Sequence, residues 1–161
     1  MAEVQGHTKR IQDLKLNKDR TQAITASKDK TAKIWDIASY DTIEELKCIK
    51  HPTNCNTAAF NPTKPHVACG GGQEAMDVTT TAASQGYFEC FIYNMITEDK
   101  VAMFKGHFGP INHLAFSPDG SQICTGGEEG YIRLNHLDPS YTNYRDIDLE
   151  LGTPGQLVSA L

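Results

Sequence analysis

The stretch from Gly6 to Asp36, GHTKRIQDLKLNKDRTQAITASKDKTAKIWD, decides the fold of this 161-residue chain. Its opening Gly-His pair returns at Gly106 and His107, an offset of 100 residues. Further identical residues share that offset, namely Ile11 and Ile111, Leu14 and Leu114, Asp19 and Asp119, Gln22 and Gln122, and Thr25 and Thr125. One spacing that is kept over so many positions indicates an internal repeat.

A third copy lies between these two, at an offset of 44 residues from the first. The pair Lys50-His51 takes the place of the first Gly-His pair. Towards the end of this copy the offset grows to 58 residues, so that Ile92–Asn94 matches Ile34–Asp36. The middle copy therefore carries 58 − 44 = 14 extra residues, at about 73–86.

Short apolar and β-branched runs separated by turn residues predict β-strands. In the first copy these runs are Ile11–Leu16, Ala23–Ser27 and Thr31–Trp35, and we expect outer strands at Thr42–Lys47 and Lys100–Phe104. The tetrapeptide Ser-Pro-Asp-Gly at 117–120 suits a type I turn, because proline presets φ at the second position and glycine follows at the fourth. Helical periodicity does not extend over a useful length, so the sequence predicts an all-β fold of four-stranded antiparallel sheets.

A period in the low forties that opens with Gly-His and closes with Trp-Asp is typical of WD repeats, which the chain resembles along nearly its whole length. The resemblance implies a partial WD-repeat β-propeller of about three four-stranded blades, out of about seven expected for a closed ring. We place the repeats at about 1–47, 48–104 and 105–151, within one propeller segment 1–151, and expect a flexible tail at 152–161. Such an open arc should leave two apolar blade faces in water. We therefore expect either that the chain is a truncated or partial product or that another chain covers those faces.

The resemblance also implies a hydrogen-bonded structural tetrad in the first copy, made of His7, Ser27, Asp29 and Trp35. A buried indole N–H needs a hydrogen-bond acceptor. The hydroxyl, imidazole and carboxylate would form a chain of hydrogen bonds from that N–H to a turn. The later copies are degenerate. The third has Gly127, Glu129 and Asn135 in place of the Ser, Asp and Trp, and the middle copy keeps only His51.

None of the residue patterns indicates catalysis or ligand chemistry. The set Ser27, His7 and Asp29 contains the residue types of a catalytic triad, but Ser27 lies in a predicted strand without a nucleophile elbow. The run Gly70–Gly72 lacks the Lys-Ser/Thr ending of a phosphate-binding loop. His107 could suggest a metal ligand, but its place in the repeat already explains it. We therefore assign no catalytic, cofactor-binding or metal-binding residue and expect a protein that is not an enzyme.

Composition further limits the classes of protein to which the chain can belong. A total of 15 Lys and Arg against 20 Asp and Glu gives a net charge of −5, which argues against a direct nucleic-acid site. No apolar run approaches the ~18 residues of a membrane span, and the N-terminus lacks the pattern of a secretory signal. The five cysteines are odd in number and form no C-x-x-C pair, which argues against a disulfide framework and favours a reducing compartment.

The extra segment of the middle copy begins GGGQEAMDVTTT, from Gly70 to Thr81. From its residues alone it is a tight glycine turn that leads into a long loop on one rim. The string resembles the corresponding segment of the subunit I family of eukaryotic translation initiation factor 3. We take as the family-signature insertion Gly70, Gly71, Gly72, Gln73, Glu74, Ala75, Met76, Asp77, Val78 and Thr79. Strings at 25–36, 105–120 and 126–141 also agree, although Glu129 stands where the family usually has Asp, and the resemblance is to the C-terminal half only.

This resemblance implies a non-catalytic scaffold subunit of initiation factor 3 in the cytoplasm, without a cofactor. Such a subunit supports association with the 40S ribosomal subunit and recruitment of mRNA and initiator tRNA. Its expected partners are the other subunits of the factor, the b and g subunits among them, with no direct nucleic-acid site and no membrane. The alternative is a WD-repeat adaptor in another pathway, such as receptor signalling, and a generic adaptor should lack the insertion.

Overall fold

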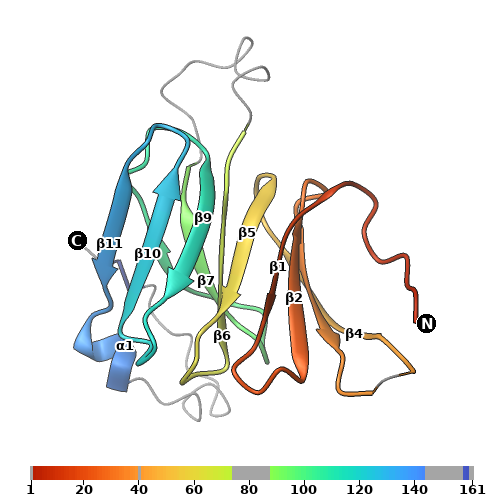
Figure 1. Cartoon of the computed structure of the whole chain (residues 1–161). Helices are drawn as coiled ribbons and strands as arrows, with labels where there is room; N and C mark the ends of the chain where they lie inside the picture. The colour runs from red at the N-terminus through yellow and green to blue at the C-terminus, as the bar shows by residue number, and fades with distance from the viewer. Residues whose placement is uncertain (1, 40, 74–87, 144–157, 160–161) are drawn as a thin grey trace.

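The computed structural model describes residues 2–39, 41–73, 88–143 and 158–159 (Figure 1). It is an all-β arrangement of three sheets that follow one another in chain order, as the repeats predict. The first sheet contains β1 (Ile11–Leu16), β2 (Gln22–Ser27), β3 (Thr31–Asp36) and β4 (Glu44–Lys50). The middle sheet contains β5 (Cys55–Phe60), β6 (His66–Gly71), β7 (Cys90–Asn94) and β8 (Lys100–Phe104). The third contains β9 (Ile111–Phe116), β10 (Gln122–Gly127) and β11 (Ile132–His136).

Consecutive strands within each sheet pair antiparallel, and the inner strands β1, β5 and β9 lie next to one another. This is the arrangement of a partial WD propeller. The outer strand β4 begins two residues later than predicted and continues to Lys50, because it stays paired with β3 as far as Thr31. The end of the predicted third repeat, residues 144–151, lies outside the described residues.

Two features of the C-terminal part differ from expectation. Within the predicted flexible tail 152–161, β12 (Val158–Ser159) pairs in parallel with β8 and so extends the middle sheet. The physical reason is that the outer edge of β8 offers unpaired N–H and C=O groups to any extended segment. A short helix, α1 (Pro139–Asn143), follows β11 and had no periodicity by which it could be predicted.

Apolar layers between the sheets hold the arc together. The layer between the first and middle sheets includes buried Ile24, Ile34, Ile49, Val67 and Phe91. The layer between the middle and third sheets includes buried Ile92, Phe104, Ile111, Leu114 and Ile123. Branched side chains suit a pleated surface, and each full burial contributes about 1.5–3 kcal/mol. The fold therefore depends on contacts between neighbouring copies more than on any single copy.

The turns between the first two strands of the outer sheets repeat one geometry. The N–H of Asn17 donates to Gln22 O at 2.9 Å, and the N–H of Ser117 donates to Gln122 O at the same distance. At equivalent positions of these turns Arg20 has a φ of 60° and Gly120 a φ of 72°. Glycine adopts this left-handed conformation freely, whereas arginine does so at a cost.

Candidate functional site

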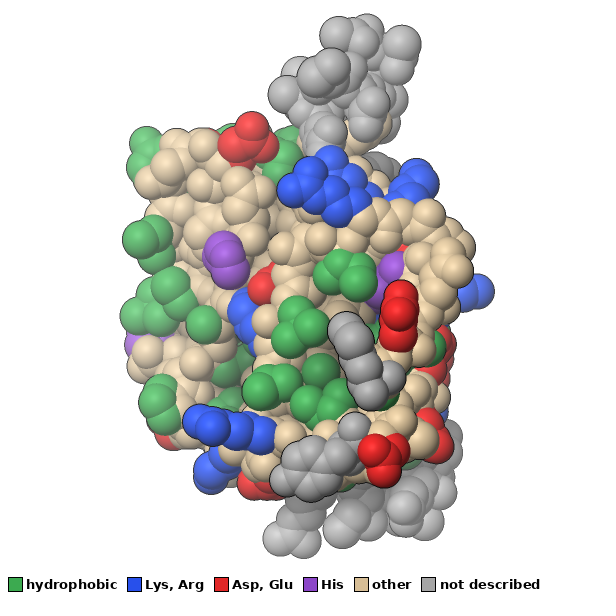
Figure 2. All heavy atoms as spheres, turned by 45° about the vertical axis from the view of Figure 1, so that its right-hand side comes forward, with side chains coloured by type: hydrophobic (Ala, Val, Ile, Leu, Met, Phe, Trp, Pro, Cys, Tyr) green, Lys and Arg blue, Asp and Glu red, His purple; other side chains and the backbone are tan. Residues whose placement is uncertain are grey.

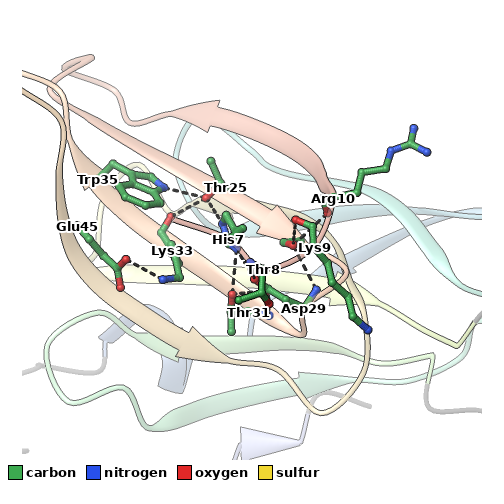
Figure 3. A network of polar contacts seen from close by, with 11 residues as sticks. His7, Thr8, Lys9, Arg10, Thr25, Asp29, Thr31, Lys33, Trp35 and Glu45 are labelled. Atoms are coloured by element: carbon green, nitrogen blue, oxygen red, sulfur yellow. Dashed lines mark hydrogen bonds and ion pairs between the residues drawn. The ribbon is translucent and has the colours of Figure 1, made fainter. Parts of the chain in front are cut away.

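A chain of hydrogen bonds runs through the first sheet from its only tryptophan to a surface turn (Figure 3). The indole N–H of Trp35 on β3 donates to Thr25 Oγ1 on β2 at 2.8 Å. Thr25 Oγ1 lies 2.7 Å from His7 Nε2, and His7 Nδ1 lies 2.8 Å from Asp29 Oδ2. The network thus joins the N-terminal segment to two strands and to the turn between them.

Asp29 completes the network because several donors converge on its carboxylate. The hydroxyl of Thr31 donates to Oδ1 at 2.6 Å, and the backbone N–H of Thr8 donates to Oδ2 at 3.1 Å. Burial alone would raise the pKa of Asp29, but the hydrogen bonds from Thr31, His7 and Thr8 outweigh it and lower the pKa to about 2. Asp29 is therefore a fixed negative charge that orients the imidazole of His7.

The structure corrects the predicted tetrad at one position, since Thr25 and not Ser27 accepts the indole N–H. Ser27 Oγ instead donates to the carbonyl oxygens of Lys9 and Arg10, at 3.1 and 3.0 Å, and accepts the N–H of Asp29. Ser27 lies two residues nearer the turn on the same face of β2 and therefore tethers the N-terminal segment. The repeat itself held the signal, because Thr25 recurs as Thr125 whereas Ser27 meets Gly127.

The third sheet keeps more of this network than its sequence indicates. His107 Nε2 lies 2.8 Å from Thr125 Oγ1, and His107 Nδ1 pairs with the carboxylate of Glu129. Burial opposes the charge of Glu129, but the bond to His107 outweighs it and lowers the pKa of Glu129. Asn135 replaces the tryptophan and Glu129 replaces the aspartate, so the His–hydroxyl–carboxylate part of the network persists.

At the same positions, the middle sheet relies on apolar packing instead of the hydrogen-bonded network. His51 is buried against Phe91, and desolvation lowers the pKa of His51 to about 4. Cys69 and Tyr93 stand where the first sheet has Thr25 and Trp35. The hydrogen bond with Cys55, together with burial, raises the pKa of Cys69, and burial raises the pKa of Tyr93. A neutral imidazole, thiol and phenol fit a junction that relies on packing.

Lys15 connects all three inner strands, a role that the sequence analysis missed. Its Nζ donates to Thr57 Oγ1 at 3.0 Å on β5 and to Leu114 O at 2.6 Å on β9. The same Nζ lies 3.0 Å from Asp13 Oδ2 on its own strand. Burial raises the pKa of Asp13, but the bonds from Thr57 and Lys15 outweigh that effect and lower it. No local pattern could reveal these contacts, because they join different copies of the repeat.

The glycines that open the insertion serve close packing. A β-carbon on Gly71 would collide with the carbonyl oxygen of Asn54, and one on Gly70 would come within 2.9 Å of Ile111 Cγ2. Gly72 has a φ of 154° and lies against Phe88. Gln73 is the last described residue of the signature, and the predicted positions Glu74, Ala75, Met76, Asp77, Val78 and Thr79 lie outside the described residues.

The ends of the inner strands surround a hollow of about 360 Å³. Leu16, Phe60 and Phe116 line it from equivalent positions of the three copies, together with Pro62 and Pro118. Such a hollow can accept an apolar side chain of a binding partner.

Comparisons with known proteins agree with the repeat pattern. The family model described as WD domain, G-beta repeat matches residues 1–36 and 98–134, which belong to the first and third copies. Eukaryotic translation initiation factor 3 subunit I of Nematostella vectensis is 48% identical over 147 residues, covering 91% of this chain and 44% of the relative. The human and Bombyx mori proteins of the same name are 44% and 46% identical and cover 89% and 88% of the chain. The chain is a WD-repeat homologue of subunit I of eukaryotic translation initiation factor 3. It spans less than half the length of these relatives, 42–44% of each.

The described part of this subunit I homologue contains no cluster of three or more His, Cys, Asp or Glu side chains placed to hold a metal ion. Over the same ranges, no helix is long and apolar enough to cross a membrane. Lys33 on β3 donates to Glu45 Oε2 at 2.7 Å, and its Nζ lies 5.9 Å from the centre of the Trp35 ring.

Proposed function

We propose that the chain is a non-catalytic scaffold subunit of eukaryotic translation initiation factor 3. The observation that carries this proposal is the 48% identity to a subunit I protein over 91% of the chain. The described His, Asp and Thr side chains of the tetrad support it, because they are engaged in holding strands together. A platform of packed sheets with loops at its rims suits the binding of partner segments.

In this role the sheets present fixed loops and the apolar hollow at Leu16, Phe60 and Phe116 to neighbouring subunits. The proposed partners are the b and g subunits of the factor, and through the complex the 40S ribosomal subunit in the cytoplasm. The contribution to mRNA and initiator tRNA recruitment would be indirect. The net charge of −5 agrees with that, since a direct nucleic-acid interface needs a basic surface.

Purification of the tagged chain from cytosol at moderate salt tests the proposal, with the bound proteins identified by mass spectrometry. We expect other initiation factor 3 subunits to be recovered in amounts comparable with the tagged chain. The variant Phe60→Asp places a charge in the hollow and should reduce that recovery, while Ile96→Asp, at a loop position that is 66% exposed, should not. Recovery of a signalling complex instead, or of no initiation factor subunit, would overturn the proposal.

A further inference from the structure

Four basic residues lie at one end of the first sheet, where the chain enters β1 and where a turn joins β2 to β3. We call this group the basic rim, and it consists of Lys9, Arg10, Lys30 and Lys50. All four residues are exposed, and among the described residues their side chains have no hydrogen-bond or ion-pair partner. Lys and Arg side chains gather at this end of the molecule, near the top of Figure 2.

Hydrogen bonds to the backbone hold the rim in place. Ser27 Oγ donates to the carbonyl oxygens of the Lys9-Arg10 pair, at 3.1 and 3.0 Å. The N–H of Lys30 donates to Ser27 O at 3.2 Å, and the N–H of His51 donates to Lys30 O at 2.8 Å. The bond from His51 places Lys50 beside Lys30, because Lys50 immediately precedes His51 in the chain. The four charges are therefore carried by an ordered backbone, which lowers the entropic cost of binding a partner.

The internal repeat shows that the fold does not require these charges. The third sheet forms the same turn without a lysine, since the N–H of Gly130 donates to Gly127 O at 3.1 Å. Lys50 replaces the glycine that precedes the histidine in the first and third copies. The third copy has an uncharged residue at each of the four positions, namely Gly109, Pro110, Gly130 and Gly106. The positive charge is thus specific to this end of the first sheet.

The backbone of Lys30 has a conformation that favours glycine. Lys30 has a φ of 67° and its equivalent Gly130 a φ of 85°, so both lie in the left-handed region. Glycine adopts this conformation freely, whereas lysine does so at a cost. Strain at a position where the third copy has glycine indicates that the lysine side chain serves a purpose other than folding.

The charges of the rim complement those of an acidic partner. Asp29 is the acidic residue of the turn, and its carboxylate already accepts hydrogen bonds from Thr31 and Thr8 and pairs with His7. The ammonium and guanidinium groups of the rim are therefore available to carboxylates of another molecule. Charge-assisted hydrogen bonds of this kind give specificity and speed association.

A protein segment fits this surface better than RNA does. Proteins bind single-stranded RNA with aromatic side chains on which bases stack. The strongly exposed aromatic residues of the described chain, Phe108 and Tyr131, lie in loops next to β9 and β11 and not on the basic rim. The net charge of −5 also opposes a long polyanion more than a short segment with few carboxylates.

We propose that the basic rim binds a short acidic segment of a partner protein, whose Asp and Glu carboxylates pair with the four cations. This proposal goes beyond the scaffold role, which does not specify the chemistry of any partner segment. The observation that carries it is the juxtaposition of four unpaired cations at positions where the third copy has none.

Fluorescence anisotropy of a labelled oligoglutamate peptide, titrated with the purified 161-residue chain at low salt, tests the proposal. We expect saturable binding that weakens as added salt screens the charges. Lys30→Glu and Lys50→Glu should each weaken binding by about threefold to tenfold, because each replaces an attraction by a repulsion. Lys18→Glu is the matched control, since it makes the same charge change at an exposed position in the β1–β2 turn, and it should bind like the unsubstituted chain.

Lys30→Gly separates binding from structure. It removes a charge of the rim and also the left-handed strain, so it should weaken binding of oligoglutamate while raising the melting temperature of the chain. A loss of stability without a loss of binding would instead assign Lys30 a structural role and overturn the proposal.

Circular dichroism establishes that each variant is folded, as expected for substitutions at exposed positions. Absence of saturable binding would overturn the proposal, and so would equal binding by Lys30→Glu, Lys50→Glu and Lys18→Glu. Tighter binding of an oligouridylate of the same charge would assign the rim to RNA and would also overturn it. None of these outcomes depends on other initiation factor subunits, so failure here is distinguishable from failure of the proposed function.

Discussion

Trp35 donates its indole N–H to Thr25 Oγ1, 2.8 Å away on the adjacent strand, and this contact links the core of the first sheet to His7 and Asp29. Trp35 is 5% exposed and Thr25 is 4% exposed, so water cannot replace a lost partner. An unpaired buried donor costs about 1–3 kcal/mol. Loss of either partner in this pair should therefore lower the stability of the first sheet.

Thr25→Val removes the acceptor while keeping the shape of the side chain. We expect it to lower the free energy of unfolding by about 1–3 kcal/mol, since the indole N–H is left unpaired. Urea denaturation followed by fluorescence of the single tryptophan measures this change. Thr25→Ser retains the hydroxyl and should lose less than Thr25→Val, and equal losses for the two variants would contradict the assigned contact.

Asp29 makes the stability of the first sheet depend on pH. Its pKa is about 2 in the folded chain against an ordinary 3.8, so its contribution is complete above pH 3.8 and is lost as the pH falls through about 2. Asp29→Asn should therefore be less stable than the unsubstituted chain by about 1 kcal/mol at pH 5, with the gap shrinking towards pH 2. Denaturation of both proteins across this range measures the gap, and a gap that stays constant with pH would contradict the assignment.

Arg20 and Gly120 occupy equivalent turn positions with positive φ, so opposite substitutions should have opposite effects. Arg20→Gly relieves the left-handed strain and should stabilise the chain by about 0.5–1 kcal/mol. Gly120→Ala should destabilise it by about 1–2 kcal/mol, because its β-carbon adds the same strain and would approach Asn61 Oδ1 at 2.6 Å. Thermal melts of the two variants and of the unsubstituted chain test both predictions. A melting temperature of Arg20→Gly below that of the unsubstituted chain would contradict the first of them.

Lys15→Met removes the ammonium group that joins the three inner strands. We expect a loss of about 2 kcal/mol, since Asp13 is left without its positive partner in a partly buried position. The double variant Lys15→Met with Asp13→Leu removes the unpaired charge as well and should recover part of the loss. If the double variant were less stable than Lys15→Met by the full effect of Asp13→Leu alone, the two side chains would not be coupled.

Much of the fold could be predicted because repeated residues and strand propensity indicate the same sheets. The three copies, their strands and the Ser-Pro-Asp-Gly turn all follow from local sequence. The choice between Thr25 and Ser27 did not, because residues two apart share one face of a strand and only the exact register decides which meets Trp35. The offset of 100 residues was the stronger guide, since it pairs Thr25 with Thr125.

Contacts between copies could not be predicted from the sequence, for a different reason. Lys15 is one of several lysines in the first repeat, and nothing near it in the chain indicates a bond to Leu114 O, 99 residues away. The helix α1 is equally hidden, because five residues are too short for periodicity. Its Tyr141 is buried with its hydroxyl 2.8 Å from His66 Nδ1, a contact fixed by the packing of distant strands.

The central claim is that this chain acts as a scaffold within initiation factor 3, and gradient sedimentation of a cytosolic extract that contains the tagged chain tests it most directly. The account predicts that the tagged chain sediments with the other factor subunits and with the 40S ribosomal subunit, and that the pool with Phe60→Asp shifts to the top of the gradient. A tagged chain found wholly at the top of the gradient, apart from every other factor subunit, would contradict the account.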